Sequence, residues 1–207
     1  MNLPKLYPIT DARLSGLSHA EQLARLSEGG ATFIQLREKH LSPREFYHET
    51  EAALDIARER GVRLIVNDRA DIALALGADG LHLGQHDLDP MAARRLLGDR
   101  FIIGYSTHSV AQAIEAARLP LDYIALGPIF DTRTKANPDP IVGLEALRRA
   151  RASIDPSIPL VAIGGITPSN ARATLDAGAD SIALISALLH PPDSITRRTE
   201  EFIKSLG

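Results

Sequence analysis

Residues 77–84 read GADGLHLG and residues 178–185 read GADSIALI, so one joint between a helix end and an apolar run occurs at two distant places. Residues 29–36, GGATFIQL, and residues 120–127, PLDYIALG, have the same form. The four joints lead into the second, fourth, sixth and eighth apolar runs of the chain. A joint that recurs at every second run indicates similar strand–helix units that close into a ring.

The four joints belong to a longer alternation of apolar runs with amphipathic, helix-like segments. Strands that alternate with helices favour a parallel sheet. Eight units of about 26 residues each fall at the compact end of the range for (β/α)8 barrels. The alternative is an open, doubly wound sheet, but the first strand–helix turn, TDARLSG, lacks the GxGxxG pattern of that fold. We therefore expect an α/β protein, a single-domain (β/α)8 TIM barrel over residues 1–207, with strands in the runs 5–10, 32–36, 63–67, 80–84, 101–106, 122–127, 159–165 and 181–186.

The composition narrows the classes of function. The chain has 207 residues, of which 44% are hydrophobic and 24% charged, which is enough for one sizeable core. The net charge is −3 and no run of like charges occurs, so neither nucleic acid nor an anionic membrane is expected as a partner. Cysteine is absent, which excludes disulfides, thiolate chemistry and cysteine metal sites. The start, MNLPKLYPIT, lacks a signal-peptide pattern, and no apolar stretch has the length of a spanning helix, so a cytoplasmic protein is expected.

Chemistry in such a barrel is expected where the strands end, at the C-terminal face. The second run continues as QLREK, in which Gln35, Arg37 and Lys39 share parity and project to one side of an extended chain. Leu36 and Glu38 project to the other side. Taken alone, this segment could also be an ordinary solvated strand end.

Two carboxylates follow adjacent strands. Asp68 comes after the third run and could either bind a ligand or cap the helix expected from Ala70. Asp87 comes after the fourth run, where Asp89 before Pro90 already supplies the helix cap. Oxygen ligands on neighbouring loops, with no cysteine near them, suit a hard cation such as Mg²⁺ that keeps several waters.

The fifth, seventh and eighth runs also end in polar residues or glycine. Ser106, Thr107 and His108 follow the fifth run, but His82, His86 and His108 show no zinc-site spacing. His82, inside an apolar run, is expected to be a hydrogen-bonded interior residue. The glycine pair in AIGGIT and Ser186 at the turn after the eighth run predict a phosphate site made of backbone N–H groups.

Residues 127–135 read GPIFDTRTK, so the sixth run leads directly into two threonines, an arginine and a lysine. A rim with two carboxylates together with Arg37, Lys39 and Lys135 favours a ligand with several negative charges that binds together with a metal. The loop 131–142 contains prolines and an asparagine and is expected to close over this ligand as a lid.

With QLREK, NDR, HLGQHD, GYSTHS, GPIFDTRTK, AIGGI and ALIS in order along its whole length, the chain resembles the thiamine-phosphate synthase family. That family is a transferase family that joins hydroxymethylpyrimidine diphosphate to a thiazole phosphate. The resemblance implies that the C–O bond to diphosphate breaks first and that the thiazole nitrogen captures the resulting cation. It also implies Mg²⁺ ligation by Asp68 and Asp87, and catalytic roles for Arg37, Lys39, Ser106 and Lys135. The pyrimidine diphosphate would be bound by Gln35, Leu36, Arg37, Glu38, Lys39, Asn67, Ser106 and Lys135. The thiazole phosphate would be bound by Thr132, Arg133, Thr134, Gly165, Ile185 and Ser186.

Two alternatives remain beside this interpretation. The thiazole tautomerases, a sister family with the same barrel, carry a catalytic histidine where this chain has Pro128, and the intact TRTK motif also favours the synthases. A non-catalytic barrel that binds thiamine precursors is the second alternative, and TRTK with both carboxylates counts against it. The expected partners are small-molecule substrates; a homodimer is expected only by analogy with other small barrels.

Overall fold

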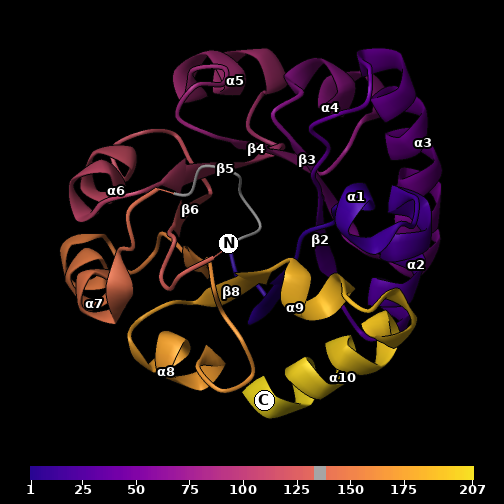
Figure 1. Cartoon of the computed structure of the whole chain (residues 1–207). Coiled ribbons are helices and arrows are strands. Elements are labelled where there is room, and N and C mark those ends of the chain that lie inside the picture. Colours follow the sequence, from indigo (N-terminus) through magenta and orange to yellow (C-terminus); the bar gives the residue numbers. More distant parts are fainter. Residues whose placement is uncertain (133–138) are drawn as a thin grey trace.

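The computed structural model describes residues 1–132 and 139–207, and Figure 1 shows a central barrel of strands surrounded by helices. The sheet has eight strands in the order β1-β8-β7-β6-β5-β4-β3-β2, and every paired neighbour is parallel. The predicted (β/α)8 barrel is therefore confirmed. The strands are β1 (Leu6–Pro8), β2 (Phe33–Leu36), β3 (Arg63–Asn67), β4 (Gly80–Leu83), β5 (Ile102–Thr107), β6 (Tyr123–Leu126), β7 (Leu160–Ile163) and β8 (Ser181–Leu184).

The barrel closes between β1 and β2, where the ladder is reduced to one bridge. Ile9 pairs with Gln35 in parallel, and the Thr10 N–H donates to the Gln35 carbonyl at 2.9 Å. Each strand is followed by one or more helices on the outside of the barrel (Figure 1). They are α1 (Ala12–Ser15), α2 (His19–Glu28), α3 (Pro43–Arg60), α4 (Ala70–Leu76), α5 (Pro90–Leu97), α6 (Val110–Ala116), α7 (Gly143–Ser153), α8 (Ala171–Asp176), α9 (Ser186–Leu189), the 3₁₀ turn η1 (Pro192–Ser194) and α10 (Ile195–Leu206).

The repeated joint has a physical basis in the barrel. At three of the four joints, an aspartate just before the strand accepts the backbone N–H of the preceding strand. Asp79, Asp122 and Asp180 accept from Leu64, Ile103 and Leu160, each at 2.8 Å. The carboxylate therefore fixes the register between β3 and β4, between β5 and β6 and between β7 and β8, which explains why the same sequence recurs at every second strand.

The hydrophobic core has two parts. The larger lies between the sheet and the helices, and the smaller lies inside the barrel, where it includes Leu3, Tyr7, Phe33 and Tyr123. The three aromatic rings meet edge to face, with the Tyr7 and Phe33 centroids 4.7 Å apart. Gly104 on β5 leaves the space for them, because a Cβ at that position would overlap the Tyr123 ring. The barrel interior is thus packed and forms no channel.

Several helices of the barrel begin at a residue whose side chain caps their N-terminus. Ser18 and Ser42 each form a capping box, with Glu21 and Glu45 respectively. Asp89 caps α5 by accepting from the Ala92 N–H at 3.0 Å, as expected from the sequence. Among the helices of the described residues, none is long and apolar enough to cross a membrane.

Candidate active site

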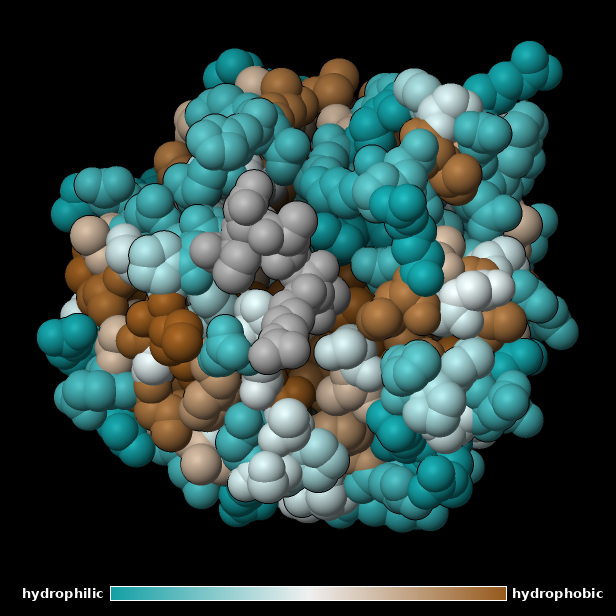
Figure 2. Space-filling view, viewed as in Figure 1, coloured by the Kyte–Doolittle hydropathy of each residue, from teal (hydrophilic) through white to brown (hydrophobic). Residues whose placement is uncertain are grey.

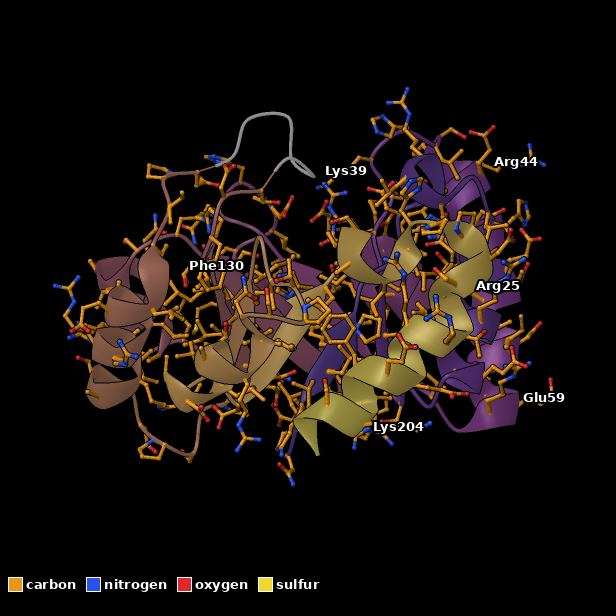
Figure 3. The ribbon with its side chains drawn as sticks, turned by 60° about the horizontal axis from the view of Figure 1, so that its bottom comes forward. Arg25, Lys39, Arg44, Glu59, Phe130 and Lys204 are labelled. Carbon is orange, nitrogen blue, oxygen red and sulfur yellow. The ribbon has the colours of Figure 1, made fainter. Side chains whose placement is uncertain are left out.

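Asp68, Asp87 and Lys39 come together at the C-terminal ends of β2, β3 and β4. The Lys39 ammonium forms an ion pair with the Asp68 carboxylate, and the Asp87 carboxyl lies close enough to raise the pKa of Asp68. Figure 3 shows Lys39 at the rim opposite the end of the barrel where Lys204 of α10 lies. The two carboxylates that the sequence placed on neighbouring loops therefore meet.

The backbone explains why Asp68 reaches this cluster. Its φ of 63° places it in the left-handed region, which no other non-glycine residue of the described chain occupies. The Asp68 N–H donates to the His82 carbonyl at 2.9 Å, which holds the loop against β4. The alternative that Asp68 caps α4 is wrong, because Arg69 is the N-cap and no side chain caps this helix.

The electrostatics of the pair depend on burial. Partial burial raises the pKa of the Asp68 carboxyl, and the nearby Asp87 carboxyl raises it further, while Lys39 opposes both effects. Asp87 also accepts the Gly84 N–H at 2.7 Å, which closes the loop after β4. It therefore has a structural role that the sequence did not indicate. Two carboxylates that repel one another beside one lysine form a site suited to a further cation.

The side chains of the other QLREK residues alternate in direction along the chain. Arg37 donates to the Asp11 carboxylate at 3.3 Å, beside Lys39 at the rim, and Leu36 is buried in the outer core. Glu38 turns away from the rim: it accepts from the N–H groups of residues 39, 40 and 41 and pairs with buried His19 at 3.2 Å. Burial raises the Glu38 pKa, but hydrogen bonds, first from the His40 N–H, outweigh it and leave the pKa low. The Glu38 side chain therefore holds the loop, and only its backbone can face a ligand.

Ser106 lies at the end of β5, and buried His82 connects it to the barrel interior. The His82 Nε2 lies 2.8 Å from the Ser106 hydroxyl, and Nδ1 lies 2.9 Å from the Tyr123 hydroxyl. The expectation of a hydrogen-bonded interior histidine is therefore met. Tyr7 and Tyr123, whose hydroxyls are 2.8 Å apart, were missed by sequence reasoning. The only feature of the sequence that could have indicated them is that each places a hydroxyl group at an inward-facing position of its strand.

Desolvation on burial is the main cause that lowers the pKa of His82 to about 4. In the unfolded chain a histidine titrates near pH 6.5. Between these values the unfolded chain binds more protons, so the free energy of unfolding should fall as pH decreases from about 6.5 to about 4. We expect a loss of about 3 kcal/mol from this residue. Denaturant melts of the wild type and His82→Gln over this range measure it as a difference in slope, and parallel curves would contradict it.

The residues expected to hold the thiazole phosphate follow β6, β7 and β8. Gly165 has a φ of 63°, and a Cβ there would overlap the backbone of Asp131, so tight packing of the loop after β6 already requires this glycine. Ile185 directly precedes α9, which begins at Ser186. Thr132 is the last described residue before the gap, and Arg133, Thr134 and Lys135 lie outside the described residues.

Other rim residues follow β3, β4 and β5. Asn67 ends β3, is buried, and pairs with His82 in the ladder between β3 and β4. The Gln85 amide donates to the Ser106 carbonyl at 2.6 Å and so ties the loop after β4 to β5. His108 bonds the Gly127 carbonyl at 2.8 Å. The space-filling view shows mostly hydrophilic side chains around the upper part of the barrel mouth, on the side of β3, β4 and β5 (Figure 2).

A closed eight-stranded barrel with charged side chains gathered at the C-terminal ends of its strands is the arrangement of barrel enzymes, whose active sites lie on that face. The family model described as thiamine monophosphate synthase matches residues 6–188. The chain is 46% identical to a thiamine-phosphate synthase of Chloroflexus aurantiacus over 190 residues, covering 91% of this chain and 87% of that protein. It is 44% identical to one of Koribacter versatilis over 214 residues, covering 100% and 97%.

A solved structure gives the same result. The thiamine phosphate pyrophosphorylase from Pyrococcus furiosus superimposes with a TM-score of 0.87 at 39% identity, covering 98% of this chain and 95% of that one. The chain belongs to the thiamine monophosphate synthase family. The resemblance inferred from the motifs is thereby confirmed, and so is the prediction of a transferase of thiamine biosynthesis.

Proposed function

We propose that this protein joins a pyrimidine carrying a diphosphate to a thiazole phosphate, giving thiamine phosphate and free diphosphate. The observation that carries the proposal is the convergence of Asp68, Asp87 and Lys39 at the barrel rim, with Arg37 and Ser106 on neighbouring strand ends. Carboxylates that attract a divalent cation, next to cations and neutral donors, form a binding site for a diphosphate group.

The carboxylate pair supports Mg²⁺ as the metal. Asp68 and Asp87, which lie close together at the rim, would be its protein ligands. Mg²⁺ suits them, because it binds through one or two carboxylates together with waters and substrate phosphates. When bound, the ion would neutralise charge on the diphosphate and remove the repulsion between the two carboxylates.

The side chains around this pair would hold the leaving group. Lys39 and Arg37 would pair with the diphosphate oxygens, and the Ser106 hydroxyl would donate to the same group. Gln35 and Asn67, which line β2 and β3 below the rim, would contact the pyrimidine ring. The thiazole phosphate would be held by Thr132, Gly165, Ile185 and Ser186, together with Arg133 and Thr134; Lys135 would complete the diphosphate site.

The reaction needs little acid–base chemistry. The electron pair of the C–O bond leaves with the diphosphate oxygen, and the aminopyrimidine donates electron density to the methylene cation left behind. The lone pair of the thiazole nitrogen then forms the new C–N bond. Charge grows on the leaving diphosphate in the transition state, so fixed cations and donors around it stabilise that state more than the substrate. Exclusion of water protects the cation until the thiazole captures it.

Mixing the two phosphorylated heterocycles with the protein and Mg²⁺ tests the proposal directly. We expect thiamine phosphate and diphosphate to form in equal amounts, and chelation of the metal to stop both. Isomerisation of a thiazole without release of diphosphate would instead identify a tautomerase. Binding of both heterocycles without any product would identify a precursor-binding protein.

A further inference from the structure

A chain of hydrogen bonds crosses the barrel interior and ends at Ser106. It begins at the Gln35 amide on β2, which donates to the Tyr7 hydroxyl on β1 at 2.9 Å. From Tyr7 it continues to Tyr123 on β6 at 2.8 Å, then to His82 Nδ1 on β4 at 2.9 Å and from Nε2 to Ser106 on β5 at 2.8 Å. The first four residues are at most 6% exposed. Five strands thus contribute to one continuous chain, which we call the interior chain.

The first donor fixes the direction of the whole chain. An amide nitrogen carries hydrogens only, so the Tyr7 oxygen must accept from Gln35, and its own hydrogen is left to donate to Tyr123. The Tyr123 hydrogen then goes to His82 Nδ1. A neutral imidazole that accepts at Nδ1 carries its hydrogen on Nε2 and donates it to the Ser106 oxygen. The hydrogen of the Ser106 hydroxyl is not used by the chain.

We propose that Tyr7, Tyr123 and His82 are positioning residues that present the Ser106 hydroxyl to the barrel mouth as a hydrogen-bond donor for an anionic leaving group. The proposal rests on the proposed function, because a diphosphate offers acceptors at every oxygen. With the chain reversed, Ser106 would donate to His82 and would turn oxygen lone pairs toward the anion. Direction in the interior therefore determines whether Ser106 attracts or repels the leaving group.

A purely structural role makes a different prediction. Buried polar groups need partners, and the interior chain supplies them whether or not Ser106 contacts a ligand. A structural network would therefore lose stability when a link is removed, independently of Ser106. A positioning network acts through Ser106, so removal of a link has no further effect on turnover once the Ser106 hydroxyl is gone.

The test is a double-mutant cycle on Tyr123 and Ser106. Tyr123→Phe keeps the ring and removes the link, and we expect its kcat to fall about tenfold with little change in KM, the value of one hydrogen bond. In the Ser106→Ala background the same change should leave kcat unaltered. Tyr7→Phe, one link further away, should cost less than Tyr123→Phe. Tyr47→Phe on α3, outside the chain, serves as the matched control. If the double variant loses turnover by the product of the two single-variant factors, the two residues act independently and the proposal is overturned.

The tautomer of His82 gives a second measurement that needs no activity. Nitrogen NMR of the wild type should show hydrogen on Nε2 and none on Nδ1, and Tyr123→Phe should weaken this preference. His82→Gln, which can still donate to Ser106, should retain more turnover than His82→Leu. A histidine protonated at Nδ1 in a protein that makes thiamine phosphate overturns the proposal and leaves the proposed function intact. A protein without synthase activity overturns the proposed function and, with it, the leaving-group role of Ser106.

Discussion

Replacing Lys39 with alanine should lower turnover by about 10²–10³-fold. Two unit charges 4 Å apart interact by roughly 4 kcal/mol at an effective dielectric constant near 20, and solvent reduces this for a side chain that is 42% exposed. Because negative charge on the leaving group grows during bond breaking, most of the remaining interaction should be lost from kcat and not from KM. Steady-state kinetics with both substrates at saturating Mg²⁺ measure this effect.

The same variant should change metal binding in the opposite direction. Lys39 competes for the Asp68 carboxylate, so its removal should tighten binding of Mg²⁺ to the free protein, measured by calorimetry without substrates. Lys204→Ala is the matched control, since that lysine lies on α10 at the other end of the barrel (Figure 3) and should alter neither quantity. Near-normal turnover of Lys39→Ala would remove this residue from the diphosphate site.

Asp87→Asn should raise the Mg²⁺ concentration needed for half-maximal rate by about 10²–10³-fold. The change keeps an oxygen that can accept the Gly84 N–H, so the loop after β4 should remain folded, but it removes one of two carboxylate charges from the metal site. It should also lower the pKa of Asp68, because Asp87 is one of the groups that raise it. Metal titrations of the rate and carboxyl NMR titrations of Asp68 measure the two effects separately.

Asp89→Asn is the matched control for this prediction. Asp89 lies two residues further along the chain, but its carboxylate caps α5 by accepting the Ala92 N–H, and asparagine caps helices equally well. Its metal titration should coincide with that of the wild type. An Asp87→Asn variant with an unchanged metal titration would show that Asp87 is not a metal ligand.

The fold could be predicted because its signals are repeated and local. Each strand was a short apolar run, and the aspartates at positions 79, 122 and 180 recur because each fixes the same contact between neighbouring strands. The ends of the strands were less predictable. The run 159–165 was expected as one strand, but β7 ends at Ile163, because Gly164 and Gly165 both adopt positive φ and leave the extended conformation.

The sequence could predict only those parts of the site whose position follows from the order of the strands along the chain. Strand ends of a parallel barrel meet on one face, and this was sufficient to bring Asp68 and Asp87 together. Whether Asp68 caps a helix could not be decided from its neighbours in sequence, because the answer depends on its left-handed backbone. Tyr7 and Tyr123 were missed for a related reason: they lie on β1 and β6, which are not neighbours in the sheet, and meet only across the closed interior.

The packed interior has a kinetic consequence. Below the rim, Leu3, Tyr7, Phe33 and Tyr123 fill the barrel, so no passage leads through its interior to the opposite end. On the proposed function, both reactants arrive, and both products depart, at the rim. Because the proposed pyrimidine contacts Gln35 and Asn67 are buried below the rim, we expect the pyrimidine diphosphate to bind first, the thiazole phosphate to bind second, and added pyrophosphate to compete with the first reactant.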